Sequence, residues 1–178
     1  DVSLDWESES DEVNHTVLKY HSLSSVKMML DDDTVALAEH ALGEDAQPVM
    51  TYLANALMKV PDGVMPGTRG GVVTEKRDPE VDGEIVPYSM ITAIDSKDGL
   101  GPLLDANGKA VLIKDDEVVI NSWLAENLEI GLGDWLRIDY FEPETTHGQT
   151  VERWVDLRVV EIFKLTEPRR PYSRRRKA

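Results

Sequence analysis

Three segments of this chain alternate apolar and polar side chains with a period of two residues, which is the spacing of a β-strand with one buried face. They cover residues 86–94, 134–141 and 151–163. In the second segment the apolar positions are Leu136, Ile138 and Tyr140, and the polar positions between them are Arg137 and Asp139. A helical pattern would repeat every three or four residues, so these segments predict strands and the fold must contain a sheet.

The last of these segments changes its register near the middle. Val155, Leu157 and Val159 alternate, and the next apolar residues are Val160 and Ile162. A β-bulge at Val159–Val160 would produce this shift, and a bulged strand bends. We therefore expect a mixed, strongly coiled sheet with a small barrel-like C-terminal half. Further strands are predicted at residues 48–58, 110–113 and 117–121.

Two short helices complete the predicted fold, which is α+β. The first is expected at residues 34–42, because the aspartates at 31–33 suit a helix N-terminus. The second is expected at residues 122–129, where Asn121 or Ser122 can cap the first turn.

A turn rich in glycine follows the second predicted helix. Gly131 lies where a left-handed residue would end that helix, and Gly133 and Asp134 then form a tight turn into the next strand. We expect Gly133 to adopt a positive φ angle and Asp134 to bond the amides of its own turn. The predicted role of Gly131, Gly133 and Asp134 is structural.

The domain organisation follows from the distribution of charge. The net charge is −15, yet residues 169–178 hold six basic side chains and no acidic one. We predict an acidic N-terminal arm with a short helix at residues 1–46, a single α+β core domain at 47–168, and a disordered basic tail at 169–178. Three prolines and five glycines between Pro61 and Gly83 predict a long surface loop.

No catalytic constellation is visible in the sequence. Cysteine is absent, and none of the four histidines has a partner at the spacing of a metal-binding helix. The glycines at 67–71 lack the lysine and the strand–helix context of a phosphate-binding loop. We therefore predict a protein that is not an enzyme and binds no cofactor or metal. The candidate partner-binding residues are the aromatics Trp123, Trp135 and Phe141, for which a place in the core is the alternative.

Residues 118–163 are arranged as a strand, a short helix, a Gly-Asp turn, a strand, a polar loop and a strand, with the sequence VVINSWLAENLEIGLGDWLRIDYF at the start. This arrangement resembles the periplasmic core domain of FtsX-like (MacB-type) ABC transporter permeases. Residues 51–55, 87–93 and 141–148 look like further parts of the same domain. The resemblance covers residues 47–165.

The resemblance implies a non-catalytic domain on the extracytoplasmic, periplasmic face of a bacterial cell membrane. There it would couple client binding or release to the transport cycle. The implied partners are a second permease subunit, the cytoplasmic ABC ATPase, and an extracytoplasmic client such as a lipid or lipoprotein, with no nucleic acid. One feature departs from the family, because basic runs flank membrane helices on the cytoplasmic side and the tail at 169–178 is basic.

Two alternative interpretations remain open from the sequence. Double-psi barrels, including an accessory domain of molybdopterin-type oxidoreductases, carry a similar Gly-Asp segment. A free-standing acidic protein could instead use the tail at 169–178 to bind nucleic acid or an anionic membrane.

Overall fold

The computed structural model describes most of the chain, namely residues 2–7, 14–20, 23–24, 30–43, 47–78, 80, 83–94, 103–105, 107, 109–142, 150–165 and 173–176. The chain divides into two compact units. Unit 1 consists of Asp1–Leu37 and Thr166–Ala178, and unit 2 consists of Ala38–Leu165.

Unit 1 contains a three-stranded antiparallel sheet built from both ends of the chain. Its strands are β1 (Val2–Glu7), β2 (Asn14–Tyr20) and β9 (Ser173–Arg176), in the order β2-β1-β9. In the register of β1 and β9, Val2 lies opposite Arg176. Neither β1 nor β9 was predicted from the sequence, although β1 alternates as Val-Ser-Leu-Asp-Trp-Glu. Part of the segment expected to be a disordered tail is thus a strand, and its residues pair with residues that lie 168 to 174 positions earlier in the sequence.

Helix α1 (Asp32–Leu42) ends at the predicted residue and begins two residues before the predicted start at residue 34. Asp31 accepts a hydrogen bond from the Thr34 amide at 2.9 Å, which satisfies one of the free amides of the first turn. Gly43 follows the helix with a φ angle of +59°. No residue of α1 is buried.

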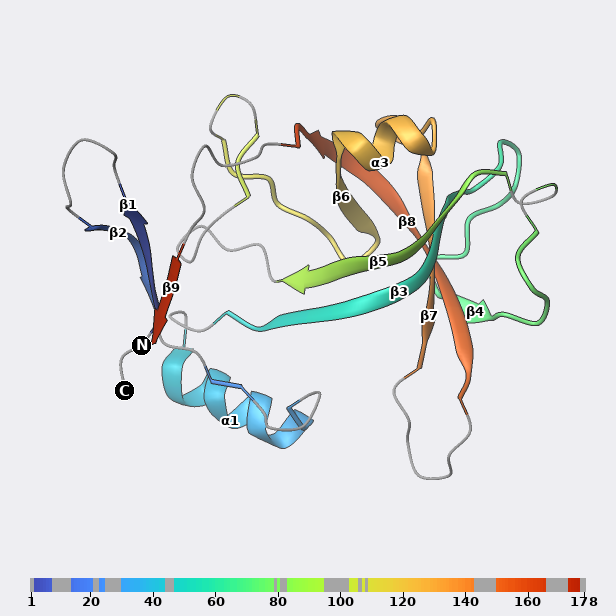
Figure 1. The fold of residues 1–178 in the computed structure, drawn as a ribbon. Helices are drawn as coiled ribbons and strands as arrows, with labels where there is room; N and C mark the ends of the chain where they lie inside the picture. Colours follow the sequence, from blue (N-terminus) through green and yellow to red (C-terminus); the bar gives the residue numbers. More distant parts are fainter. Residues whose placement is uncertain are drawn as a thin grey trace. The chain divides into compact units, whose positions relative to one another are not determined.

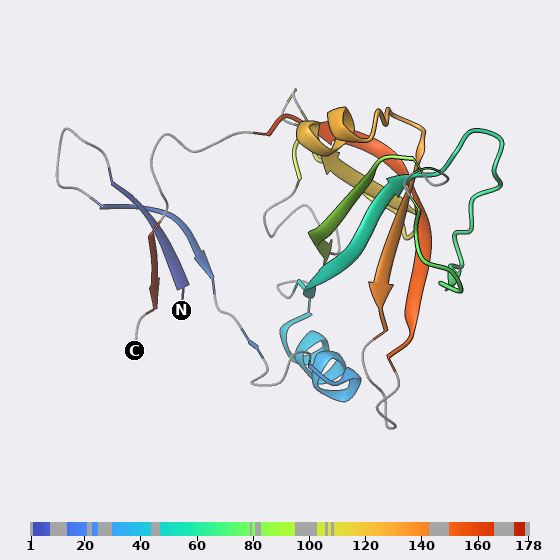
Figure 2. The ribbon, with the colours of Figure 1, turned by 45° about the vertical axis from the view of Figure 1, so that its right-hand side comes forward.

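Unit 2 is a six-stranded sheet (Figure 1). Its strands are β3 (Val49–Lys59), β4 (Gly71–Val72), β5 (Ile85–Ile94), β6 (Glu117–Asn121), β7 (Trp135–Phe141) and β8 (Glu152–Phe163). The order is β4-β8-β7-β3-β5, with every pairing antiparallel, and β6 pairs with β8 in parallel. Helix α3 (Ser122–Asn127) follows β6 directly and lies near β6 and β8 (Figure 2).

These elements confirm the α+β prediction and four of the predicted strands, those at 86–94, 117–121, 134–141 and 151–163, together with the helix at 122–129. The strand expected at 48–58 is β3. The strand expected at 110–113 is wrong, because only Ala110 forms an isolated bridge there, to Leu104. Asn121 is the residue that caps α3, with its side chain accepting from the Leu124 amide at 2.8 Å.

The expected barrel is also wrong, since the sheet neither closes nor curls strongly. The bulge itself is where the sequence predicts it: Val118 lies opposite Val159, whereas Val119 lies opposite Glu161. The pairing of β8 with β7 extends only from Glu152 to Arg158. The extra residue therefore falls beyond the β7 ladder, where it adjusts the pairing with β6 and does not bend the main sheet.

One face of the sheet and the inner side of α3 form the hydrophobic core. Its buried members are Ala54, Leu57, Ile120, Leu124, Leu128, Ile130, Leu136, Ile138 and Val159. The apolar positions of the alternating pattern, Leu136 and Ile138, are 1% and 3% exposed. The polar positions of β7 point to the opposite face, and that face carries the candidate site.

Candidate functional site

The polar face of β7 is covered. Asp139, one of the two polar positions of the alternating pattern, is fully buried. Arg77, from the segment between β4 and β5, reaches Asp139 with two hydrogen bonds, from Nε at 2.5 Å and from Nη2 at 2.9 Å. This bidentate geometry is the strong form of an arginine–carboxylate pair.

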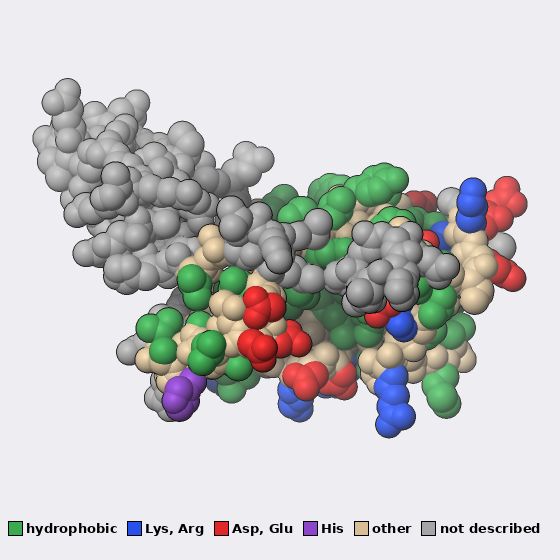
Figure 3. Space-filling view, turned by 90° about the horizontal axis from the view of Figure 1, so that it is seen from below, with side chains coloured by type: hydrophobic (Ala, Val, Ile, Leu, Met, Phe, Trp, Pro, Cys, Tyr) green, Lys and Arg blue, Asp and Glu red, His purple; other side chains and the backbone are tan. Residues whose placement is uncertain are grey.

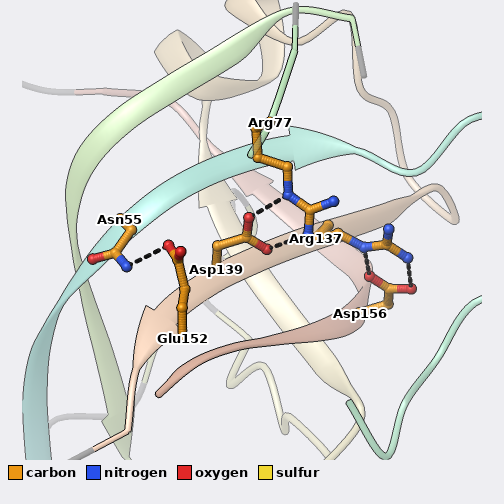
Figure 4. A network of polar contacts seen from close by, with 6 residues as sticks. All are labelled: Asn55, Arg77, Arg137, Asp139, Glu152 and Asp156. Atoms are coloured by element: carbon orange, nitrogen blue, oxygen red, sulfur yellow. Dashed lines mark hydrogen bonds and ion pairs between the residues drawn. The ribbon is translucent and has the colours of Figure 1, made fainter. Parts of the chain in front are cut away.

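A second buried ion pair lies beside the first (Figure 4). Arg137 of β7 donates to both carboxylate oxygens of Asp156 of β8, at 2.7 and 2.8 Å, and Asp156 is fully buried. The guanidinium of Arg137 lies 4.2 Å from the ring centre of Trp154, which is a cation–π contact. Of the two charged positions of β7, Arg137 thus pairs with the neighbouring strand β8, and Asp139 pairs with the segment between β4 and β5.

The cover over this face is residues 61–78, which we call the strap. The glycines and prolines of this segment predict a surface loop, and in the structure the loop packs against the sheet. The Gly67 amide donates to Asp156 Oδ2 at 2.8 Å, and Gly71 pairs with Trp154 in the β4–β8 ladder. A Cβ atom at Gly67 or Gly71 would collide with the Trp154 indole, so the glycines expected to be loop residues are needed for close approach.

At one end of this face the side chains leave a shallow pocket of about 260 Å³. Its lining includes Asn55, Arg77, Tyr88, Asp139, Phe141 and Glu152. Asn55 donates to Glu152 Oε1 at 2.6 Å across the pocket wall (Figure 4). The carboxylates of Asp139 and Glu152 therefore already accept hydrogen bonds from Arg77 and Asn55. Carboxylates held in this way are better suited to positioning a bound group than to proton transfer.

Tyr88 is the unusual residue of the pocket. It lies within β5, follows Pro87, has a φ angle of +50° and is 75% exposed. A positive φ costs free energy in a residue with a side chain, and such outliers cluster at functional sites. In the alternating pattern of residues 86–94, Tyr88 shares a face with Val86 and Met90, and no local pattern indicates its left-handed backbone.

The three aromatic candidates do not form one site. Trp135 and Phe141 are the first and last residues of the 7-residue strand β7, so their Cα atoms are about 20 Å apart. Trp123 lies on α3 and is 49% exposed. Of the three, only Phe141 lines the pocket.

The Gly-Asp turn has the predicted structural geometry. Gly133 has a φ angle of +88°, and Asp134 Oδ2 accepts from the Gly131 amide at 2.9 Å. The left-handed residue after α3 is Glu129, with φ +48°, and Gly131 does not have a positive φ, so that part of the prediction is wrong.

Lys59 of β3 adds a contact to this turn that the sequence did not indicate. Its ammonium lies 2.8 Å from Asp134 Oδ2. The hydrogen bond from Lys59, helped by the Gly131 amide, lowers the pKa of Asp134, and the same bond raises the pKa of Lys59.

Within the described residues, no group of three or more histidine, aspartate or glutamate side chains is arranged to hold a metal ion. None of the described helices has the length and apolar character needed to cross a membrane. A scan against models of known protein families and a search of curated proteins each found no match for this chain.

Proposed function

We propose that this chain is the extracytoplasmic, non-catalytic domain of an FtsX-like ABC transporter permease, which couples client binding or release to the transport cycle. The sequence resemblance at residues 47–165 suggested this role. The observation that carries the proposal is the pairing of β1 with β9.

Because Val2 lies opposite Arg176 and Asp5 lies opposite Ser173, the segments that precede and follow unit 2 are antiparallel neighbours in one sheet. Unit 2 is therefore an excursion of the chain from a paired stem. This connection fits a domain carried between two consecutive membrane helices, because the chain of such a domain leaves the membrane and returns to it nearby.

The buried ion pairs of unit 2 support a role in transmission. Breaking a bidentate buried pair is costly, so the strap and the sheet resist separation. The expected partners remain a second permease subunit, a cytoplasmic ATPase and an extracytoplasmic client. The pocket with Tyr88 and Phe141 is the part of unit 2 that we assign to client contact.

The location can be tested by cysteine labelling, since the chain contains no cysteine. Met65 is 90% exposed, and Met65→Cys gives one reactive thiol. The full-length protein encoded by the gene, with its other cysteines replaced, is expressed in its own host. A membrane-impermeant maleimide should label Met65→Cys in cells whose outer membrane alone is permeabilised, to the same extent as after lysis.

The matched control is the cysteine-free parent, which should remain unlabelled. Copurification with an ATPase subunit provides the second readout. Labelling that occurs only after lysis would contradict an extracytoplasmic location, and a full-length protein recovered without membranes would contradict the permease assignment.

A further inference from the structure

Strands β3 and β5 form a long pair that contains no charge over most of its length. Pairing runs from Val49 opposite Ile94 to Met58 opposite Ile85. No charged residue occurs in Val49–Met58 or in Ile85–Ile94, although 30% of the chain is charged. We call these two segments the uncharged strand pair.

Half of the uncharged strand pair extends beyond the rest of the sheet. Strand β7 pairs with β3 only from Ala56 to Lys59. Figures 1 and 2 show β3 and β5 continuing side by side past this point. Opposite residues of antiparallel strands share a face, so Leu53 and Met90 lie together, and they are 47% and 66% exposed. An exposed apolar surface of this kind marks an interaction site.

The outer edge of β5 supplies the hydrogen-bonding groups for such an interaction. On one side β5 pairs with β3, and no other described strand pairs with it. Proteins usually protect a sheet edge with proline, a charged side chain or an irregular backbone. Pro87 and the positive φ of Tyr88 protect the first half of β5 in this way. Ser89–Ile94 has none of these features, and in the part of the chain that the structure describes no strand other than β3 pairs with it, so this edge can serve as a template for another strand.

The charge of the protein indicates what kind of partner strand would bind to this edge. Glu84, which is exposed, directly precedes β5, and Asp95 directly follows it in the sequence. The net charge of −15 disfavours the approach of a second copy of the chain, whereas Lys or Arg side chains are attracted to the acidic protein. Figure 3 shows acidic and hydrophobic side chains next to one another on the face that it views.

We propose that the edge Ser89–Ile94 binds an extended apolar segment of a partner protein by strand addition, and that this segment carries Lys or Arg at its ends. Main-chain hydrogen bonds to β5 and apolar contacts with Leu53 and Met90 give affinity, and the flanking charges give selectivity. This inference does not depend on the transporter assignment, because it concerns only the edge and its charge.

Two peptides test the proposal on the full chain. Both contain the core Thr-Val-Thr-Val-Thr-Val, and one is flanked by two lysines and the other by two glutamates at each end. In a fluorescence anisotropy titration the lysine-flanked peptide should bind at least about tenfold more tightly. Its affinity should fall as salt rises from about 50 mM to about 500 mM, because screening weakens the attraction.

Two matched variants locate the site. Met90→Lys places a cation on the uncharged strand pair, and Leu132→Lys makes the same change at a residue of similar exposure, 66% against 63%, in the turn before β7. Binding of the lysine-flanked peptide should fall at least about tenfold in Met90→Lys and stay unchanged in Leu132→Lys. Far-ultraviolet circular dichroism verifies that both variants are folded.

Each of the other results would overturn the proposal. Equal affinity for the two peptides would show that the flanking charges do not select the partner. An equal loss of peptide affinity in both variants would show that the peptide does not bind at the uncharged strand pair. Dimerisation in sedimentation that Met90→Lys abolishes would make a second copy the occupant. Binding to phosphatidylcholine vesicles that Met90→Lys abolishes, without peptide binding, would make a lipid surface the occupant.

Discussion

At the scale of single residues, the turn between α3 and β7 has a positive φ angle at a residue that is not glycine. Two glycines occupy this turn, yet the left-handed positions belong to Gly133 and to Glu129. The Glu129 carbonyl accepts from Lys59 Nζ at 3.3 Å, and the amides around it bond back into α3. These contacts hold Glu129 in a conformation that its side chain disfavours.

The two glycines should therefore respond differently to alanine. Gly133→Ala should lower the free energy of unfolding by about 1–2 kcal/mol, because an L-residue is strained at φ +88°. Gly131→Ala should cost less than about 0.5 kcal/mol, because a Cβ there would make only an ordinary contact with Asp134. Urea denaturation of both variants provides the measurement, and equal losses would show that φ is not the determinant.

The Lys59–Asp134 pair should make stability depend on pH in a defined direction. The pKa of Asp134 is lowered from its ordinary value of 3.8, so the stability that Asp134 contributes is complete above that value and is lost as pH falls through the folded-state pKa. Lys59 has a raised pKa, so its contribution is complete below 10.5 and is lost as pH rises through the folded-state value.

Asp134→Asn tests the acidic half of this behaviour, because asparagine can still accept from the Gly131 amide. The variant should be less stable than the wild type at pH 7, and the difference should close as pH falls below about 4. Denaturant titrations at pH 7, 4 and 3 measure the difference. If the difference in unfolding free energy between the two proteins is independent of pH, the ion pair contributes nothing to stability.

At the scale of elements, the strap depends on a side chain that the sequence analysis did not single out. Arg77→Met should destabilise the protein by about 3–5 kcal/mol, because Asp139 would remain buried without its charged partner. The double variant Arg77→Met with Asp139→Leu should recover most of this loss, since no charge then remains buried.

Arg153→Met is the matched control for this prediction. Arg153 pairs with Glu142, and both side chains are 40% exposed, so the loss should be much smaller than that in Arg77→Met. Thermal or chemical denaturation of the four proteins gives the comparison. If Arg77→Met were as mild as Arg153→Met, the strap would not be held by this ion pair.

Local periodicity accounts for what the sequence could predict at this scale. The strands β5, β7 and β8, the cap at Asn121 and the bulge at Val159–Val160 are all properties of short segments. The consequence of the bulge was wrong because it depends on where the β7 ladder ends. The candidate site was missed because the pairing of Arg77 with Asp139 joins positions 62 residues apart, which no local pattern encodes.

At the scale of the whole molecule, the core and both ion pairs belong to unit 2 alone. Residues 47–165 should therefore fold without unit 1 or α1, which has no buried residue. This fragment should unfold in one cooperative transition, with a midpoint within a few degrees of that of the full chain. Calorimetry of the fragment and of the chain provides the test, and a broad transition without tertiary signal in the fragment would contradict it.

The organisation of unit 1 could not be predicted for a related reason. The pairing of β1 with β9 closes a loop that contains all of unit 2, and the composition of residues 169–178 is that of an unstructured tail. Charge alone therefore gave the wrong expectation for Ser173–Arg176.

The β1–β9 pairing has a mechanical consequence. A tension applied at Val2 and Arg176, which are opposite each other at one end of the ladder, loads the hydrogen bonds one pair at a time, as in opening a zipper. Such a joint yields at low force. Pulling on the two flanking chains would unzip unit 1 first, and unit 2, with its strap and buried ion pairs, would bear no force until the short β9 ladder had opened.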